Sequence, residues 1–430
     1  MNYQQCLEEM FALRRFGIKL DLDVIRHILA ALDNPQDRFA SIHIAGTNGK
    51  GSIAAAISSI LQHAGLHVGC YTSPHLVRFN ERICINGRPI QNAAVAAAYQ
   101  AVKKIHRGPR EPTFFEWTTA MALYEFQRRG VDWAVIETGM GGRFDATNII
   151  RPAVSIISNI SLEHKAYLGS SIEKIAFEKS GIIKSETPVV TGVRQKKALA
   201  VVARAAADAH APLFIFPRDV RVRRSRSGRF HYHGLDHRWR HINTNLAGRH
   251  QVDNAALVLA AVELLMRMGL PVDRRAVEDG LMHIDWPGRL QIVSRTPLIL
   301  LDGAHNLAAA RHLARFLRSE TGSRPVTLVI GILDDKPYRA MLDTLAPCCS
   351  RIVLTRSKID RALDPAVLLT ALGKRNIPSV IIHSVEDAVR RTIEGAAPDD
   401  VICIAGSLYV VGEAMPALAA LGTNDIRLNP

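Results

Sequence analysis

A glycine-rich segment near the start of the chain has the composition of a phosphate-binding loop. The apolar run Ser41–Ala45 leads into GTNGKGS at positions 46–52, and a helical pattern over Ile53–Ala64 follows. Glycines let backbone N–H groups approach phosphate oxygens, the start of a helix adds a favourable dipole, and Lys50 can reach the β- and γ-phosphates. This strand–loop–helix order predicts nucleotide binding, although Gly51 separates the lysine from the following serine, unlike the usual GxxxxGK[ST] pattern.

A second glycine-rich cluster, TGMGGRFDATN at positions 138–148, follows a predicted strand over Trp133–Glu137. Open α/β sheets place their ligand groups at the carboxyl ends of the strands, which is where Glu137 lies. A carboxylate at this edge suits Mg²⁺, a hard cation that takes oxygen ligands and is shared with nucleotide phosphates. His164 comes shortly after another apolar strand, so we expect it at the same edge as Lys50 and Glu137.

The composition is that of a globular protein. The chain has 430 residues, 48% hydrophobic and 22% charged, which predicts two or three domains and excludes a disordered tail. It has no apolar run near the ~20 residues that cross a bilayer, and Met1–Met10 lacks the basic start of a secretory signal. Six scattered cysteines without a CxxC pair are typical of reduced thiols in a cytoplasmic protein. The net charge of +14 could attract nucleic acid, an anionic membrane or a polyanionic substrate.

Apolar, β-branched runs alternate with helical patterns along the chain, which is typical of a parallel α/β sheet. A Pro-Gly pair at 287–288 precedes a new strand–helix alternation, so we expect domains over 1–290 and 291–430. Arg218–His241 holds eight Arg against two Asp and predicts a basic β-hairpin whose role stays open. The predicted strands are Ser41–Ala45, Val68–Tyr71, Trp133–Glu137, Val154–Ile160, Val189–Thr191, Leu298–Leu301, Val326–Ile330, Arg351–Thr355 and Val401–Ala405. The predicted helices include Ile53–Ala64, Phe115–Arg129, Asn254–Met268, Ala308–Ser319 and Ala388–Gly395.

Ordered motifs along nearly the whole chain resemble the folylpolyglutamate synthase and dihydrofolate synthase family of the Mur ligase superfamily. Besides the two glycine-rich clusters they are RFGIKL at 15–20, YTSPHLVRFNERI at 71–83, SLEHKAYLG at 161–169, EKSGIIK at 178–184, LAGRHQVDNAA at 246–256, WPGR at 286–289, LDGAHN at 301–306 and GSLYVVGE at 406–413. The resemblance implies an α/β fold: a P-loop Mur-ligase-like ATPase domain with a parallel-rich sheet, then a smaller Rossmann-like C-terminal domain that carries glutamate ligation.

The resemblance also implies where nucleotide and metal bind. The ATP phosphates would be held by Asn48, Gly49, Lys50 and Gly51. Ser73 and Glu137 would bind one Mg²⁺, with His164 completing the metal set. Ser52 stands at the usual P-loop magnesium position, so Ser52 and Ser73 remain alternatives, with the family pattern favouring Ser73.

Lys179 matches the lysine that members of this family carbamylate. A carbamate turns an ammonium group, which would repel Mg²⁺, into a carboxylate that can bind or orient it. Two Mg²⁺ ions are therefore expected, and Lys179 and His164 would hold the second. Asn254, Arg289 and Asp302 would contact ATP. His305 and Ser407 would belong to the glutamate and phosphate site, with His305 counted among the catalytic residues beside Lys50, His164 and Lys179.

The pterin-side pocket would be lined by Phe144, Asp145 and Ala146 together with Phe115 and Glu116. Phe115 stands at a predicted helix start, so a place in the hydrophobic core is an equal alternative for its ring.

The implied reaction is an ATP-dependent amide ligation. A substrate carboxylate attacks the γ-phosphorus to give an acyl phosphate and ADP, and the amine of L-glutamate then displaces phosphate. The acceptors would be 7,8-dihydropteroate and tetrahydrofolate, and the bifunctional form is favoured over a polyglutamate synthase alone. Closure about a hinge near Arg289 would assemble the site.

Two other classes remain as alternatives, a Mur-type peptidoglycan ligase and a nucleic-acid-binding P-loop ATPase. The TSPHL and DATN segments disfavour the first, and the lack of helicase-like motifs disfavours the second. The family resemblance implies a monomer, and we expect small-molecule substrates with neither a nucleic-acid nor a membrane partner.

Overall fold

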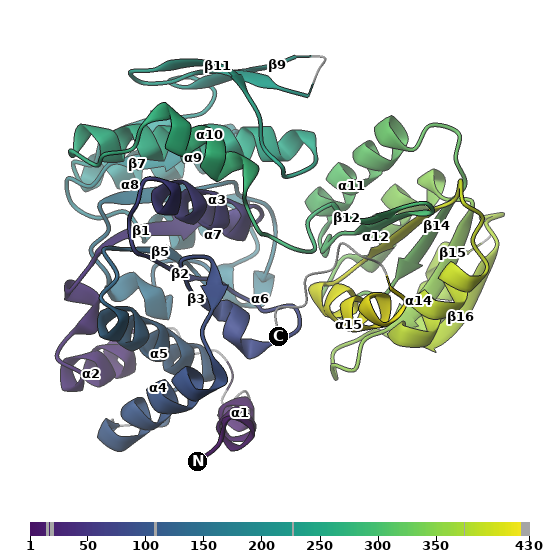
Figure 1. Ribbon diagram of the computed structural model, residues 1–430, viewed down its shortest axis with the longest axis horizontal. Coiled ribbons are helices and arrows are strands. Elements are labelled where there is room, and N and C mark those ends of the chain that lie inside the picture. The colour runs from purple at the N-terminus through teal and green to yellow at the C-terminus, as the bar shows by residue number, and fades with distance from the viewer. Residues whose placement is uncertain (14–16, 18–20, 107–109, 226–227, 374, 423–430) are drawn as a thin grey trace. The chain divides into compact units, whose positions relative to one another are not determined.

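The computed structural model describes residues 1–13, 17, 21–106, 110–225, 228–373 and 375–422 (Figure 1). Most of the RFGIKL motif thus lies outside the described residues. The chain divides into two compact units, the first formed by Met1–Asn245 with Gln251–Asp285 and the second by Leu246–His250 with the chain from Trp286 onward. The division falls just before the expected boundary at 290, and it assigns Leu246–His250 to the second unit.

The first unit is built on an eight-stranded sheet with the order β4-β3-β2-β5-β1-β6-β7-β8. The five pairings from β2 to β8 are parallel, whereas β2–β3 and β3–β4 are antiparallel. The strands are β1 Ala40–Ala45, β2 Val68–Tyr71, β3 Ile83–Ile85, β4 Arg88–Pro89, β5 Trp133–Glu137, β6 Val154–Ile157, β7 Val189–Thr191 and β8 Leu213–Ile215.

Helices cover this sheet because their apolar faces need a partner surface. Separate cores result, among them one that includes α1, α2, α4 and α5 and another that includes α7 and α8. The helices of this unit are α1 Tyr3–Ala12, α2 Asp23–Ala31, α3 Lys50–His63, α4 Asn92–Ile105, α5 Phe114–Arg129, α6 Lys165–Leu168, α7 Ile172–Ser180, α8 Lys196–Asp208, α9 Arg249–Arg267 and α10 Arg274–Met282, with the 3-10 turns η2 Pro35–Asp37, η3 Phe79–Arg82 and η4 Ala146–Ile149.

Helix α10 packs closely on α3, the helix that follows the phosphate-binding loop. Ser59 Oγ donates to the Gly280 carbonyl at 2.8 Å. A Cβ atom at Gly280 would lie 2.6 Å from Ile60 Cα, so only glycine allows this approach. The contact holds the last turns of α3 against α10.

The basic segment Arg218–His241 forms three antiparallel strands rather than the expected hairpin. They are β9 Arg221–Arg224, β10 Phe230–His233 and β11 Arg238–Ile242, in the order β11-β10-β9. The buried carboxylate of Glu263 on α9 anchors them, because it accepts from Tyr232 Oη at 2.7 Å and from His237 N at 2.6 Å. The alternation of buried Phe230, Tyr232 and Trp239 with exposed Arg and His reflects one covered and one open face.

The second unit holds a six-stranded sheet with the order β12-β13-β17-β14-β15-β16, parallel except for β12–β13. Helices α11, α12 and α13 share one hydrophobic core with this sheet. Its strands are β12 Gln291–Arg295, β13 Leu298–Leu301, β14 Val326–Ile330, β15 Arg351–Arg356, β16 Ser379–Ser384 and β17 Val401–Ala405, and its helices are α11 Leu307–Glu320, α12 Tyr338–Leu345, α13 Pro365–Leu372, α14 Val385–Glu394 and α15 Leu408–Ala420, with the turn η5 Ala346–Cys348.

The α/β class is confirmed, and so are all nine predicted strands. The strand expected over Val154–Ile160 ends at Ile157, because Ser158 and Asn159 leave the sheet and hold the loop after β1. The strands β3, β4, β8, β12 and β16 were not predicted. Within the described chain, no helix combines the length and the hydropathy of a membrane span.

Replacing Glu263 by Ala should destabilise the first unit by on the order of 3 kcal/mol, since it leaves the buried Tyr232 hydroxyl and several partly buried N–H donors without an acceptor. The free energy of unfolding, measured in urea, checks this. Arg238→Gln is the matched control, because Arg238 is exposed on the same small sheet and should change stability little. An equal, small effect for both variants would contradict the anchoring role of Glu263.

Candidate active site

The phosphate-binding loop lies at the carboxyl end of β1 and is held by the residues that follow β6. The Asn48 carbonyl accepts from Ser158 Oγ at 2.7 Å and from Asn159 Nδ2 at 2.8 Å. The Asn48 N–H donates to Asn159 Oδ1 at 3.1 Å. Gly49 takes a left-handed φ of 88° just before α3 begins, so the backbone turns into the helix at Lys50. These hydrogen bonds hold the loop on the segment that follows β6.

Two lysine side chains converge on one backbone carbonyl in this loop. Lys50 Nζ donates to the Gly46 carbonyl at 3.1 Å, and Lys179 Nζ donates to the same oxygen at 2.8 Å. Lys50 Nζ also lies 3.7 Å from Glu137 Oε1, and Lys179 Nζ lies 2.7 Å from Glu163 Oε1. The structure thus brings the predicted residues Lys50, Lys179 and Glu137 to one edge of the sheet.

Burial sets the electrostatics of the Lys179 pair. The Lys179 residue is 1% exposed, and this burial, opposed by Glu163 and reinforced by the nearby Lys50, lowers the pKa of its ammonium. For Glu163 burial acts upward, but the charges of Lys179 and Lys50 outweigh it and lower the pKa of the carboxyl to about 2. Lys179 therefore loses its proton at a lower pH than a lysine in water does.

The candidate metal ligands are partly assembled. The Ser73 N–H donates to Glu137 Oε2 at 3.2 Å, which places Ser73 beside the buried Glu137 carboxylate. The Ser52 hydroxyl is buried and accepts from Gln251 Nε2 at 3.3 Å. The exposed His164 stands at the start of α6 with φ of 45°. Among the described residues, no three His, Cys, Asp or Glu side chains form a metal-holding group.

The segment between β5 and η4 packs against the carboxyl end of α7. A Cβ at Gly142 would lie 2.8 Å from the carbonyl oxygens of both Glu178 and Lys179. The Arg143 N–H donates to the Glu178 carbonyl at 2.8 Å, and their side chains form an ion pair at 2.7 Å. Asn148 Nδ2 donates to the Gly181 carbonyl at 3.0 Å. The glycines of this cluster thus allow the close approach that positions Lys179.

Three of the predicted pterin-side residues lie in this segment. Asp145 is buried and accepts from Met140 N and Thr147 Oγ1, and burial raises the pKa of its carboxyl despite these bonds. The Phe144 ring lies 4.2 Å from the Arg143 guanidinium. Ala146 is buried and begins η4.

Phe115 and Glu116 stand in the first turn of α5. The Phe115 ring is 5.9 Å from the Tyr71 ring, and a Cβ at Gly139 would lie 2.5 Å from Phe115 Cζ. Phe115 is half-buried and packs on the hydrophobic core, so the ring has a structural role in addition to any ligand contact.

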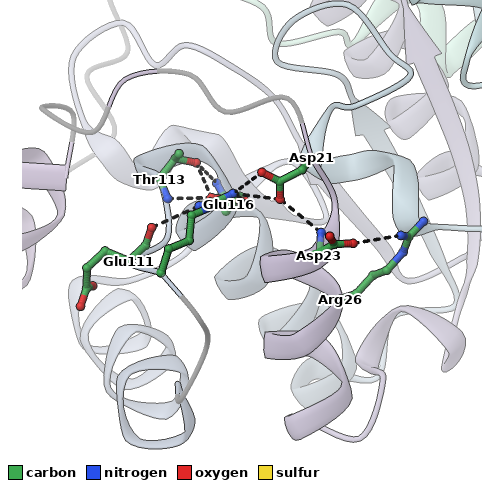
Figure 2. Close-up of polar contacts among 7 residues, drawn as sticks. Asp21, Asp23, Arg26, Glu111, Thr113 and Glu116 are labelled. Atoms are coloured by element: carbon green, nitrogen blue, oxygen red, sulfur yellow. Dashed lines mark hydrogen bonds and ion pairs between the residues drawn. The ribbon is translucent and has the colours of Figure 1, made fainter.

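The Glu116 carboxylate is engaged in holding the helix start (Figure 2). It accepts from Thr113 N at 2.7 Å in a capping box, and from both Nη atoms of Arg110. Arg110 Nη2 also lies 3.0 Å from Asp21 Oδ2, which ties α5 to the segment before α2. Sequence reasoning missed Arg110 and Asp21, although the Thr-x-x-Glu pattern at 113–116 signals the capping box itself.

Asn254 lies next to the phosphate-binding loop, where its Nδ2 donates to Gln251 Oε1 at 2.9 Å. A Cβ at Gly49 would lie 2.8 Å from Asn254 Oδ1. Gln251, which also contacts Ser52, was not predicted, and only its place in the motif at 246–256 could have indicated it.

The remaining predicted residues gather at the carboxyl ends of β13 and β17 in the second unit. Asp302 is buried, which raises the pKa of its carboxyl against the charge of Arg289, and its Oδ2 accepts from Leu290 N at 2.9 Å. His305 Nδ1 lies 2.8 Å from the Gly303 carbonyl. Ser407 caps α15 by accepting from Val410 N.

Each of the two units contains a segment that matches a family model. Residues 44–262 match the Mur ligase middle domain, and residues 288–408 match the Mur ligase glutamate ligase domain.

Curated relatives and solved structures extend this similarity. A dihydrofolate synthase/folylpolyglutamate synthase of Bacillus subtilis is 34% identical over 96% of this chain and 98% of its own length. A probable bifunctional folylpolyglutamate synthase/dihydropteroate synthase of Haloferax volcanii is 36% identical over 96% of the chain, which spans 50% of that relative. A bifunctional folylpolyglutamate synthase/dihydrofolate synthase from Yersinia pestis, solved with Mn, AMPPNP and L-glutamate bound, has a TM-score of 0.88 and 30% identity, covering 97% of this chain and 98% of that one.

Gly142→Ala should destabilise the first unit by about 1–3 kcal/mol, because the added methyl group meets two backbone oxygens that cannot move aside. Urea unfolding checks the change. Gly395→Ala serves as the control, since its Cβ would make only an ordinary contact at 3.5 Å with the Arg391 carbonyl. Unchanged stability for Gly142→Ala would contradict the close packing of this segment on α7.

Proposed function

We propose a function for this chain, which belongs to the Mur ligase family and, within it, to the folylpolyglutamate synthases/dihydrofolate synthases. The protein is an ATP-dependent ligase that joins L-glutamate to 7,8-dihydropteroate and to the γ-carboxyl of tetrahydrofolate. The observation that carries the proposal is the convergence of Lys50, Glu137 and Lys179 at the carboxyl edge of the first sheet.

Lys50 and the loop around it bind the ATP phosphates in this proposal. Gly49, Lys50 and Gly51 lie at the start of α3, where the helix dipole favours anions, and Asn48 precedes them in the loop. As the substrate carboxylate attacks the γ-phosphorus, negative charge spreads over the transferring oxygens, and the Lys50 ammonium offsets part of it. The amine of L-glutamate then attacks the acyl phosphate, the amide bond forms, and phosphate leaves.

A divalent cation fits the residues of this edge. The Glu137 carboxylate is 4% exposed and lies 3.7 Å from the Lys50 ammonium, so a hard cation finds a buried oxygen ligand there. Ser73, Glu137 and His164 would hold the ion, with Ser52 the alternative to Ser73. When bound, Mg²⁺ would supply positive charge at the phosphates.

Lys179 carries the carbamate in this proposal. Its neutral amine attacks carbon dioxide, an N–C bond forms and a proton leaves, so the reaction needs a deprotonated nitrogen. The lowered pKa of the buried Lys179 ammonium supports this assignment, and the resulting carboxylate would provide the oxygen ligand for a second Mg²⁺.

The other roles remain predictions. They concern Phe115, Glu116, Phe144, Asp145 and Ala146 for the pterin, and Asn254, Arg289, Asp302, His305 and Ser407 for ATP and glutamate. A monomeric state and a cytoplasmic location likewise remain predictions, as does the lack of a nucleic-acid or membrane partner.

Phosphate release with ATP, Mg²⁺ and L-glutamate tests the function. We expect turnover with both 7,8-dihydropteroate and tetrahydrofolate, identified by the mass of each product. Lys50→Met should lower kcat by roughly 10²–10³-fold, because it removes one preorganised charge from the transferring phosphate. Lys197→Met, which removes an exposed lysine elsewhere on this unit, should retain activity. Release with tetrahydrofolate alone would restrict the enzyme to polyglutamate synthesis, and release with neither acceptor would refute the proposal.

The carbamate can be observed directly by ¹³C NMR with labelled bicarbonate. We expect a carbamate signal that grows as the pH rises and is missing in Lys179→Arg. Because the Glu163 charge raises the pKa of Lys179, Glu163→Gln should lower that pKa further and move carbamate formation to lower pH. A signal that persists in Lys179→Arg, or the same pH dependence in Glu163→Gln, would contradict the assignment.

A further inference from the structure

A polar cavity opens at the amino ends of the parallel strands of the first sheet, whereas the phosphate-binding loop lies at their carboxyl ends. The cavity has a volume of about 260 Å³. Asn34 and Gln36, which line it, precede β1, Arg151 precedes β6, and Lys184 precedes β7. The phosphate-binding loop instead follows β1, so the cavity lies at the amino ends of the parallel strands. It is a separate site from the one that holds Lys50.

Three cationic side chains from different parts of the chain line this cavity. They are Arg26 on α2, Arg151 after η4 and Lys184 after α7. Among the described residues, none that line it is acidic. Arg26 has an exposed ion pair with Asp23 at 3.6 Å (Figure 2). Arg151 has no ion pair or hydrogen bond with any described side chain, which leaves the cavity with excess positive charge.

Lys184 is held in place by neutral oxygen acceptors, and no carboxylate of the described residues forms an ion pair with it. Its Nζ donates to the Asn148 carbonyl at 3.0 Å and to Asn148 Oδ1 at 2.8 Å, both of them neutral acceptors. Burial and the charge of Arg26 lower the pKa of its ammonium to about 8. Lys184 is a half-buried lysine fixed by amide oxygens in a cavity that Arg26 and Arg151 also line, so an anion there would offset unfavourable charge.

We propose that this cavity binds the phosphate group of a small anion. Two guanidinium groups and an ammonium group suit a phosphate dianion, since guanidinium forks match phosphate oxygens in pairs. The volume is below the roughly 300–1,000 Å³ of sites for drug-sized ligands, so the ligand is compact. Free phosphate and a diphosphate group share the chemistry that the cavity recognises.

The cavity is connected to the helix that carries Lys179. Lys184 holds Asn148, and Asn148 Nδ2 donates to the carbonyl of Gly181 at the end of α7. An anion on Lys184 would therefore act on the segment that positions Lys179.

Calorimetric titration of the full chain with inorganic phosphate and with pyrophosphate tests the site. Saturating ADP with Mg²⁺ fills the phosphate-binding loop, and repeating the titration in Lys50→Met shows that this loop does not contribute. We expect one saturable site in both backgrounds, with affinity reduced at least tenfold in Arg151→Gln and in Lys184→Met. Arg204→Gln, at an exposed position on the same unit, should bind as the unchanged protein does.

Equal binding of both probes would identify free phosphate as the ligand, and a preference for pyrophosphate would indicate a diphosphate group. Arg151→Gln keeps the test valid if Lys184→Met fails to fold, because Arg151 is exposed. The proposal fails if neither probe binds, if tri-γ-glutamate binds here while both phosphates do not, or if both variants bind like Arg204→Gln. Since binding is measured without turnover, the outcome does not depend on the ligase activity.

Discussion

The burial of one ammonium group constrains the arrangement of the candidate site. Removing a charge from water costs several kcal/mol unless partners replace the lost hydration. Lys179 meets this requirement with the Gly46 carbonyl and the Glu163 carboxylate, which come from two different connections of the sheet. The Lys179 ammonium therefore links the loop after β1, the segment after β6 and helix α7, in addition to the hydrogen bonds that Ser158 and Asn159 make with Asn48. Lys50 donates to the same Gly46 carbonyl, so this carbonyl also helps to position the Lys50 side chain.

Small residues make this arrangement sterically possible. Gly142 lets the segment after β5 reach the carbonyl oxygens at the end of α7, and Gly139 makes room for the Phe115 ring. The TGMGGRFDATN cluster thus serves packing as well as chemistry, since the same residues that would face a ligand also fix the helix carrying Lys179. In this segment structural and functional requirements cannot be assigned to separate positions.

The parallel strands could be predicted because strands buried on both faces are continuous apolar runs, as Trp133–Glu137 and Val401–Ala405 illustrate. The edge strands β4 and β16 escaped prediction because they are short or half-exposed, so their sequences lack that pattern. The candidate residues at strand ends followed from topology and from the family resemblance. Arg110 and Glu263 could not be found in this way, because each acts through a partner that is distant along the chain or through a local cap, and no periodicity encodes such a pair. Gln251 could have been indicated only by its place in the motif at 246–256.

The close packing of α10 on α3 affects the entropy of nucleotide binding. Gly280 and Ser59 hold the last turns of the helix that follows the phosphate-binding loop, and Ser158 and Asn159 hold Asn48 within the loop itself. The conformational entropy of that loop is therefore lost once, when the chain folds, and not again at each encounter with a nucleotide. Preorganisation of this kind lets a small number of N–H groups bind phosphate without reordering the backbone. A preorganised loop also requires that a nucleotide fit the loop as folded. The loop then discriminates between ligands by their shape and not by changing its own conformation.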